Sequence, residues 1–115
     1  MNFQNHFSFL DFYKQVTSLK RNDKKVLLAI GGWNDSKGDK YSRMVNSKPN
    51  RKAFINHIVK FLTENNFDGL DLDWEYPKCW QVDCNLGPKQ DKQGLADLVR
   101  ELHFAFKPLG MKYIL

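Results

Sequence analysis

In the stretch Asp68-Gly69-Leu70-Asp71-Leu72-Asp73-Trp74-Glu75, apolar and acidic residues alternate strictly from position 70 onward. A period of two is typical of a β-strand, because successive side chains of an extended chain point to opposite faces. We therefore expect a strand from about 67 to 74, with acids about 6 to 7 Å apart along one face. One face carries Asp71, Asp73 and Glu75, and the other carries Leu70, Leu72 and Trp74.

The rest of the chain predicts helices and strands in alternation. Helical spacing of apolar residues, N-terminal Ser and Pro, and terminal Asn, Pro and Gly set the expected bounds. We expect helices over 7–20, from Ser47 and Pro49 to Asn65, and over 95–106. Loops are expected over 34–50, with a short helical turn near 41–45, and over 76–91. Further strands are expected over 26–30 and 111–115.

This alternation predicts an α/β fold built from βαβ units. The continuous apolar run 26–30 is typical of a parallel strand that is covered on both faces. Functional loops of such folds lie at the carboxyl ends of the strands. The last strand would lie at an open sheet edge, which native folds avoid, so we expect this chain to be part of a longer domain.

Composition excludes two classes of partner. The chain has 115 residues and a net charge of +5, but its basic residues occur in short clusters between elements, which does not favour nucleic-acid binding. No apolar run approaches the roughly 20 residues that cross a bilayer, and the opening residues lack the pattern of a signal peptide. We expect neither nucleic acid nor a membrane as a partner.

The two cysteines, Cys79 and Cys84, are separated by four residues. No second cysteine pair or nearby histidine completes a zinc site. A local disulfide fits this spacing, and two free thiols in a reduced protein are the alternative that composition leaves open.

The row of acids is expected to have a chemical role, because burying unpaired carboxylates costs several kcal/mol each. Three acids so close do not all ionise readily, so at least one is expected to hold a proton near neutral pH, as a general acid must. Glu75 is the best candidate, since it lies last on the strand, with Asp73 and Asp71 deeper. Asp68 is out of phase with them and is expected to bond local backbone at the strand entry.

Metal binding is an alternative role for alternating acids, which also ligate Mg²⁺ or Ca²⁺. An EF-hand is excluded, because its loop needs a glycine and polar residues where Leu72 and Trp74 stand. Metal-dependent phosphoryl transfer stays open, although the sequence has no glycine-rich phosphate cradle with a lysine. We expect neither a metal nor a cofactor.

The segment 68–75 matches Asp-x-x-Asp-x-Asp-x-Glu and so resembles the signature of family 18 glycoside hydrolases, the chitinases. The segment 25–33, which ends in Gly-Gly-Trp, is similar to the preceding strand of that family. The segments 79–84 and 91–94 look most like arthropod chitinases. The similarity covers nearly the whole chain.

The resemblance implies a (β/α)8 barrel, of which this chain holds about three parallel strands with their helices. Because a closed barrel needs roughly 250 residues, we expect residues 1–115 to be a fragment of a catalytic domain and to be inactive by itself. The implied enzyme is a secreted, monomeric chitinase. It hydrolyses β-1,4-linked N-acetylglucosamine polymers internally, with retention, by a substrate-assisted mechanism.

The resemblance also implies the roles of individual residues. Glu75 would protonate the glycosidic oxygen while the acetamido oxygen of the substrate attacks the anomeric carbon. Asp73 would hold the acetamido group, and Asp71 would share a proton with Asp73. The implied substrate-binding residues are Trp33 and Tyr76, whose rings suit sugar faces, and Gly31 and Gly32, which would let backbone approach closely.

Several positions complete the expectations. Ala29 stands where the family strand often has Ser, and Asn34-Asp35-Ser36 is an N-glycosylation sequon beside the expected cleft. His6, His57 and His103 are expected at the surface, away from the chemistry. The alternative to an enzyme is a chitin-binding lectin of the same fold; such relatives usually lack the terminal Glu, which is present here as Glu75.

Overall fold

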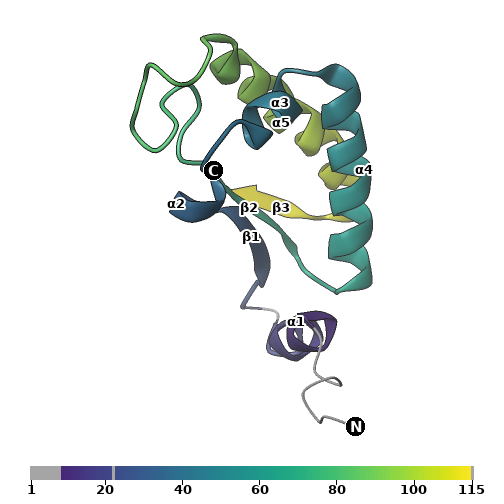
Figure 1. Cartoon of the computed structure of the whole chain (residues 1–115). Coiled ribbons are helices and arrows are strands. Elements are labelled where there is room, and N and C mark those ends of the chain that lie inside the picture. The colour runs from purple at the N-terminus through teal and green to yellow at the C-terminus, as the bar shows by residue number, and fades with distance from the viewer. Residues whose placement is uncertain (1–8, 22, 115) are drawn as a thin grey trace, which may run out of the picture.

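The computed structural model describes residues 9–21 and 23–114 as helices and strands in alternation (Figure 1). In chain order the elements are α1 (Phe9–Thr17), β1 (Leu27–Gly31), α2 (Gly32–Asp35), α3 (Lys40–Val45), α4 (Lys48–Glu64), β2 (Gly69–Asp73), α5 (Gln90–Phe106), the 3₁₀ helix η2 (Lys107–Leu109) and β3 (Lys112–Ile114). The expected order of helices and strands is confirmed.

The three strands form a parallel sheet in the order β1-β2-β3. Asp71 lies at the centre of this sheet, paired in register with Ala29 on β1 and with Ile114 on β3. Parallel neighbours require crossovers, and α4 and α5 provide them along one side of the sheet (Figure 1). The acid-bearing strand is therefore the middle strand of the sheet.

One face of the sheet makes the hydrophobic core. Alternate residues of β2 and the residue after it are buried against α3, α4 and α5; the core includes Leu70, Leu72, Trp74, Val45, Ile55, Ile58, Leu62, Leu98, Leu102 and Phe106. The apolar stripes expected for the second and third helices are therefore confirmed at their buried positions.

The other face of the sheet is open, contrary to the expectation of cover on both faces. Ala29 and Asp73 are exposed, and the remaining β1 residues are only half-buried. Successive crossovers of one hand place their helices on the same side of a sheet, so α4 and α5 cover only one face. Within the described residues, nothing packs over the face that carries Asp73.

Helix ends follow local hydrogen bonding. At the start of α4, Ser47 accepts a hydrogen bond from the backbone N–H of Asn50 at 3.3 Å and Pro49 lies in the first turn, as expected. The first helix ends at Thr17 rather than residue 20, and the hydroxyl of Thr17 donates to the carbonyl oxygen of Tyr13 at 2.9 Å. Residues 7, 8 and 115 of the expected elements lie outside the described residues, as does His6.

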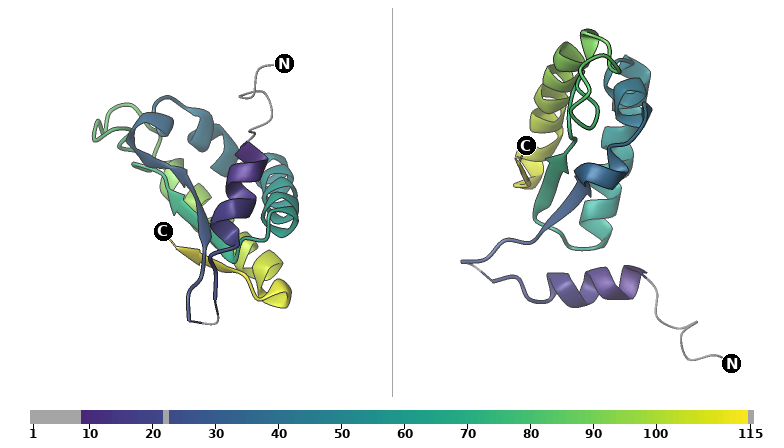
Figure 2. Two further views of the ribbon diagram at one scale, coloured as in Figure 1. Left: turned by 90° about the horizontal axis from the view of Figure 1, so that it is seen from below. Right: turned by 60° about the vertical axis from the view of Figure 1, so that its left-hand side comes forward.

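Two side chains, Arg51 and Tyr13, join the helices to neighbouring segments. The Arg51 guanidinium of α4 donates to both carboxylate oxygens of Glu101 on α5, at 2.6 and 3.2 Å, and to the carbonyl oxygen of Val45 at 2.8 Å. Helix α1 lies across the end of the sheet where β1 begins (Figure 2). There Tyr13 packs edge-on against Phe61 and Phe67. The opposite end of the sheet carries the acids.

Candidate active site

The alternation of faces in the acidic strand is confirmed by burial. Leu70, Leu72 and Trp74 are buried, whereas Asp71 and Glu75 are half-buried and Asp73 is exposed. Strand β2 ends at Asp73, so Glu75 lies two residues beyond the strand and not within it, because β1 turns away there and offers no further backbone partner. The acids therefore follow the open face of the sheet to its carboxyl end.

The pKa of the Asp71 carboxyl is raised. Burial in the middle of the sheet is the largest cause, followed by the negative charge of Asp73 and a hydrogen bond between the two side chains. Among the three acids, the raised pKa therefore belongs to Asp71. The assignment of the catalytic proton to Glu75 stays a prediction.

The backbone of Glu75 is held on both sides. Its N–H donates to the hydroxyl of Ser36 at 2.9 Å, and its carbonyl oxygen accepts from the backbone N–H of Gln81 at 3.1 Å. The peptide bond between Glu75 and Tyr76 is cis. The Glu75 backbone is therefore attached to the segment after β1 and to the loop after β2.

Glycine is needed at positions 31 and 32 for different reasons. At Gly31, where φ is +100°, a Cβ atom would lie 2.4 Å from the carbonyl oxygen of Asp73, so this position leaves no room for a side chain. Its part in substrate binding stays a prediction. At Gly32 nothing lies within 4 Å of such an atom, and the requirement is instead the φ of +83°. The two glycines turn the chain over the end of β2.

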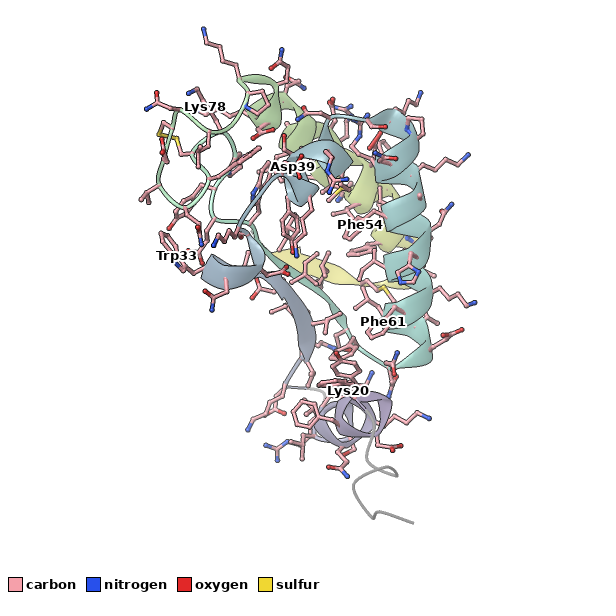
Figure 3. The ribbon with its side chains drawn as sticks, viewed as in Figure 1. Lys20, Trp33, Asp39, Phe54, Phe61 and Lys78 are labelled. Atoms are coloured by element: carbon pink, nitrogen blue, oxygen red, sulfur yellow. A yellow bond between two sulfur atoms is a disulfide. The ribbon has the colours of Figure 1, made fainter. Side chains whose placement is uncertain are left out.

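The aromatic residues expected at the cleft lie at the surface. Trp33 on α2 is 48% exposed and Tyr76 is 45% exposed, so neither ring belongs to the core. In Figure 3, Trp33 and the loop that carries Lys78 lie on the same side of the molecule, at the left of the view. Both rings lie close in sequence to the end of the sheet that carries the acids.

Short helix α2 is attached to the core by Asp35. Its carboxylate accepts hydrogen bonds from Lys40 and from the hydroxyl of Tyr41. These two bonds lower the pKa of Asp35, and the bond from Lys40 has the larger effect. The pKa of Tyr41 is raised, first by burial and then by its hydrogen bond to Asp35. The Tyr41 ring stacks on Trp74 at 5.9 Å between centroids. The segment that carries Trp33 is thus coupled to the strand that carries the acids.

Within the loop over residues 76–89, Cys79 and Cys84 form a disulfide. The local disulfide is therefore confirmed, and the alternative of two free thiols is wrong. The attachment of this loop to the helices is Asp91, which is fully buried at the start of α5. The Asp91 carboxylate accepts from Lys78 N and Trp80 Nε1, each at 2.9 Å. It also accepts from Ser42 Oγ at 2.5 Å and from Asn46 Nδ2 at 2.8 Å.

Sequence reasoning missed both Asp91 and Ser36. Asp91 lies four residues before Leu95 and seven before Leu98, so it falls on the apolar stripe of its own helix. An acid within such a stripe was a usable signal for a buried polar contact. For Ser36 the sequence carried no such signal, because its partners lie 37 and 39 residues away.

The remaining expected positions divide as follows. Asp68 accepts from the backbone N–H of Val26 at 2.8 Å and pairs with Lys20 at 3.5 Å, so it bonds a neighbouring strand entry and not local backbone as expected. His57 and His103 are exposed, as is Asn34 of the sequon, whereas Ser36 is fully buried.

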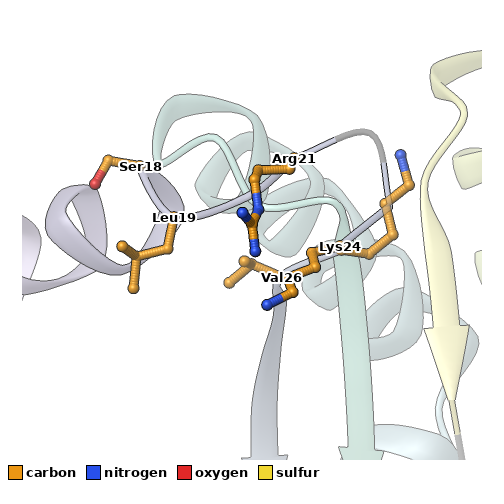
Figure 4. Close-up of a pocket in the computed structure, with 6 residues that line it drawn as sticks. Ser18, Leu19, Arg21, Lys24 and Val26 are labelled. Carbon is orange, nitrogen blue, oxygen red and sulfur yellow. The ribbon is translucent and has the colours of Figure 1, made fainter.

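Other features of the described residues do not suggest a second site. The pocket in Figure 4 lies at the end of the sheet opposite to Glu75 and is lined by residues of the segment between α1 and β1: Ser18, Leu19, Arg21, Lys24, Lys25 and Val26. No group of three or more His, Cys, Asp or Glu side chains among the described residues is arranged to hold a metal ion. No described helix is long and apolar enough to cross a membrane.

Comparison with known proteins gives a consistent result. The family model described as glycosyl hydrolases family 18 matches residues 1–115. The chain is 50% identical over 115 residues to probable chitinase 10 of Drosophila melanogaster. The matched region covers 96% of this chain and 5% of that protein. It is 41% identical over 100 residues to the endochitinase of Manduca sexta, covering 85% of this chain and 17% of that protein.

Solved structures agree with these sequence matches. Catalytic domain 2 of the Ostrinia furnacalis group II chitinase matches with a TM-score of 0.88 and 58% identity, over 94% of this chain and 29% of that one. A mutant of that domain, solved in complex with penta-N-acetylchitooctaose, matches with a TM-score of 0.87 and 59% identity, over 90% and 27%. The chain thus spans less than a third of each of these relatives.

Proposed function

The chain belongs to glycosyl hydrolase family 18, and from this premise we propose that it forms part of the catalytic domain of a chitinase. Its fold is α/β, and its three parallel strands with their helices are a portion of a (β/α)8 barrel. The proposed reaction is internal hydrolysis of β-1,4-linked N-acetylglucosamine polymers with retention of configuration. The proposed substrates are chitin and chito-oligosaccharides.

The observation that carries the proposal is the row of acids on the open face of β2, which leads to Glu75 at the carboxyl end of the sheet. Active sites of barrel enzymes lie at this end. We assign Glu75 as the acid that protonates the glycosidic oxygen. The acetamido oxygen of the substrate attacks the anomeric carbon, and Glu75 then activates the water that opens the cyclic intermediate.

Asp73 and Asp71 are assigned to the acetamido group. Asp73 is exposed on the open face, where its carboxylate can accept the acetamide N–H and offset the positive charge that develops on the ring. The raised pKa of Asp71 supports a proton held beneath Asp73, where it bonds the Asp73 carboxylate. When Asp71 is neutral, the single negative charge of Asp73 offsets the positive charge that develops on the sugar ring.

The two exposed aromatic residues are assigned to sugar binding. Trp33 and Tyr76 each present about half of their surface to solvent, and aromatic faces suit the apolar faces of sugar rings. Gly31 and Gly32 set the turn that carries Trp33.

We also propose that the protein is secreted and acts as a monomer. The disulfide between Cys79 and Cys84 supports an oxidising compartment, because cytosolic thiols are kept reduced. The presence of Glu75 favours hydrolysis over a lectin that only binds.

The test is Glu75→Gln in a complete catalytic domain that contains this chain. Loss of the acid is expected to lower turnover of a chito-oligosaccharide at least 1,000-fold, since the acid takes part in both chemical steps. Binding of the same oligosaccharide is expected to persist. The matched control is Glu64→Gln, an exposed residue at the end of α4, which should leave turnover unchanged.

Hydrolysis at the normal rate by the Glu75→Gln enzyme would refute the assignment. Wild-type hydrolysis is also expected to survive a chelator. Loss of activity with chelator would instead favour the metal-dependent alternative.

A further inference from the structure

We propose that Ser36 is a positioning residue that fixes the backbone of the catalytic acid, with Gln81 bracing the same backbone from the opposite side. This inference deepens the proposed function and rests on it. The assignment concerns the hydroxyl of Ser36 and the N–H and carbonyl groups of Glu75.

The need for a positioning residue follows from where β2 ends. The ladder between β1 and β2 stops at the pair Gly31 and Asp73, because the chain turns away at Gly31. Glu75 is two residues further on, so its N–H has no ladder partner. A backbone N–H left without a partner at a half-buried position would leave the acid loosely placed.

Ser36 supplies the missing partner. Its side chain is fully buried, and its hydroxyl accepts from Glu75 N at 2.9 Å while lying 3.5 Å from the carbonyl oxygen of Asp73, to which it donates. A hydroxyl has one donor and two acceptor positions, so both bonds form together. The side chain therefore takes the place that strand β1 would have occupied beside β2.

Gln81 completes the brace on the other side of Glu75. Its backbone N–H donates to the carbonyl oxygen of Glu75 at 3.1 Å, and its side-chain Nε2 donates to the carbonyl oxygen of Trp33 at 2.8 Å. Gln81 lies inside the ring closed by the disulfide of Cys79 and Cys84. Both polar groups of the Glu75 backbone are thereby tied to the segment that carries Trp33.

The segment that holds Ser36 is itself anchored. Asp35 bonds Tyr41, and the ring of Tyr41 stacks on Trp74, the residue between the two backbone groups that Ser36 contacts. These contacts thus join the segment with Asp35 and Ser36, helix α3 and the residues at the end of β2 to one another. With its backbone held, the Glu75 carboxyl moves only by its own side-chain torsions, and small errors in the placement of a catalytic group have large effects on rate.

The test is Ser36→Ala in the complete catalytic domain. We expect kcat to fall about tenfold or more while KM for a chito-oligosaccharide stays within twofold, since the substrate contacts remain and only the acid is displaced. The matched control is Ser47→Ala, which also removes a hydroxyl that accepts a backbone N–H, but at the start of α4. Ser36→Thr, which keeps the hydroxyl, should recover most of the lost kcat.

Equal losses of kcat in Ser36→Ala and Ser47→Ala would overturn the inference, as would kcat within twofold of wild type in Ser36→Ala. Should Ser36→Ala show no cooperative melting, Gln81→Ala tests how Gln81 itself is held, because it removes the Nε2 bond to the carbonyl oxygen of Trp33 and keeps the backbone N–H that donates to Glu75. A fall in its kcat of at least threefold at constant KM supports the inference, and an unchanged kcat overturns it. If Glu75→Gln retains full turnover, the proposed function fails first, so the two failures are distinguishable.

Discussion

Asp71 lies half-buried in the middle of β2, with the carboxyl of Asp73 beside it and Ala29 opposite it on β1. Ala29 has no hydroxyl, so the residue at the paired position on β1 offers no side-chain donor to an ionised Asp71. The position suits a shared proton, and it is unfavourable for a negative charge. Chemistry and stability therefore make opposite demands on this one residue.

Asp71→Asn is expected to stabilise the protein at neutral pH. Because the folded-state pKa of Asp71 is raised, the folded protein keeps this proton at pH values where the unfolded chain has lost it. Stability is therefore lost as pH rises from the ordinary aspartate pKa through the folded value, and is fully present below it. The amide removes this loss.

The check is urea unfolding of both proteins at pH 3 and pH 7. The variant should match wild type at pH 3 and exceed it in free energy of unfolding at pH 7. The control is Asp23→Asn, whose side chain is 79% exposed and which should show no such difference between the two pH values. A variant that is less stable than wild type at pH 7 contradicts the account.

At the scale of elements, the loop over residues 76–89 depends on one buried carboxylate. Asp91 joins this loop to α3 through Ser42 and Asn46, and to its own helix α5. The loop also carries Gln81 and the disulfide, so its attachment bears on the placement of Glu75. A single buried residue at the start of a helix thus attaches a 14-residue loop to two helices.

Asp91→Asn is expected to destabilise the protein by about 2–4 kcal/mol, because an amide turns one accepting oxygen into a donor that faces other donors. The measurement is the free energy of unfolding in urea. The matched control is Asp39→Asn, an exposed acid paired with Arg43 at 3.1 Å, which should cost less than about 1 kcal/mol. Similar losses in the two variants would argue against the buried network.

At the scale of the whole molecule, the sheet is covered on one face and open on the other. The edges at β1 and β3 and the acid-bearing face are covered by nothing among the described residues. Hydrogen bonds and charges stabilise a transition state most where water is excluded. An open face leaves Asp73 in contact with solvent.

We therefore expect the 115-residue chain by itself to hydrolyse chito-oligosaccharides at least 1,000-fold more slowly than a complete catalytic domain that contains it. The assay compares both proteins on the same soluble oligosaccharide at equal concentration. Circular dichroism of the short chain is the control for folding. Turnover by the short chain within tenfold of the complete domain would contradict the role assigned to a closed site.

The elements and their faces could be predicted from the sequence, because they depend on neighbours only a few positions apart. The alternation from Leu70 to Glu75 determined which side chains share a face, and the Ser47 and Pro49 signals determined where α4 begins. Residues at the ends of elements were less predictable. Helix α1 ends at Thr17, three residues earlier than apolar spacing indicated.

By itself, the sequence determined the family, the order of helices and strands, and the acids that line one side of β2, because period and spacing are local properties of the chain. Tertiary structure alone decided which sheet face is covered, that Asp71 carries the raised pKa, and that Ser36 and Asp91 hold the loops in place. The bonds of Ser36 and Asp91 join residues 13 to 49 positions apart, and the raised pKa of Asp71 depends first on its burial in the sheet. Only the folded chain brings such groups within hydrogen-bonding distance, and burial then sets the strength of the interaction.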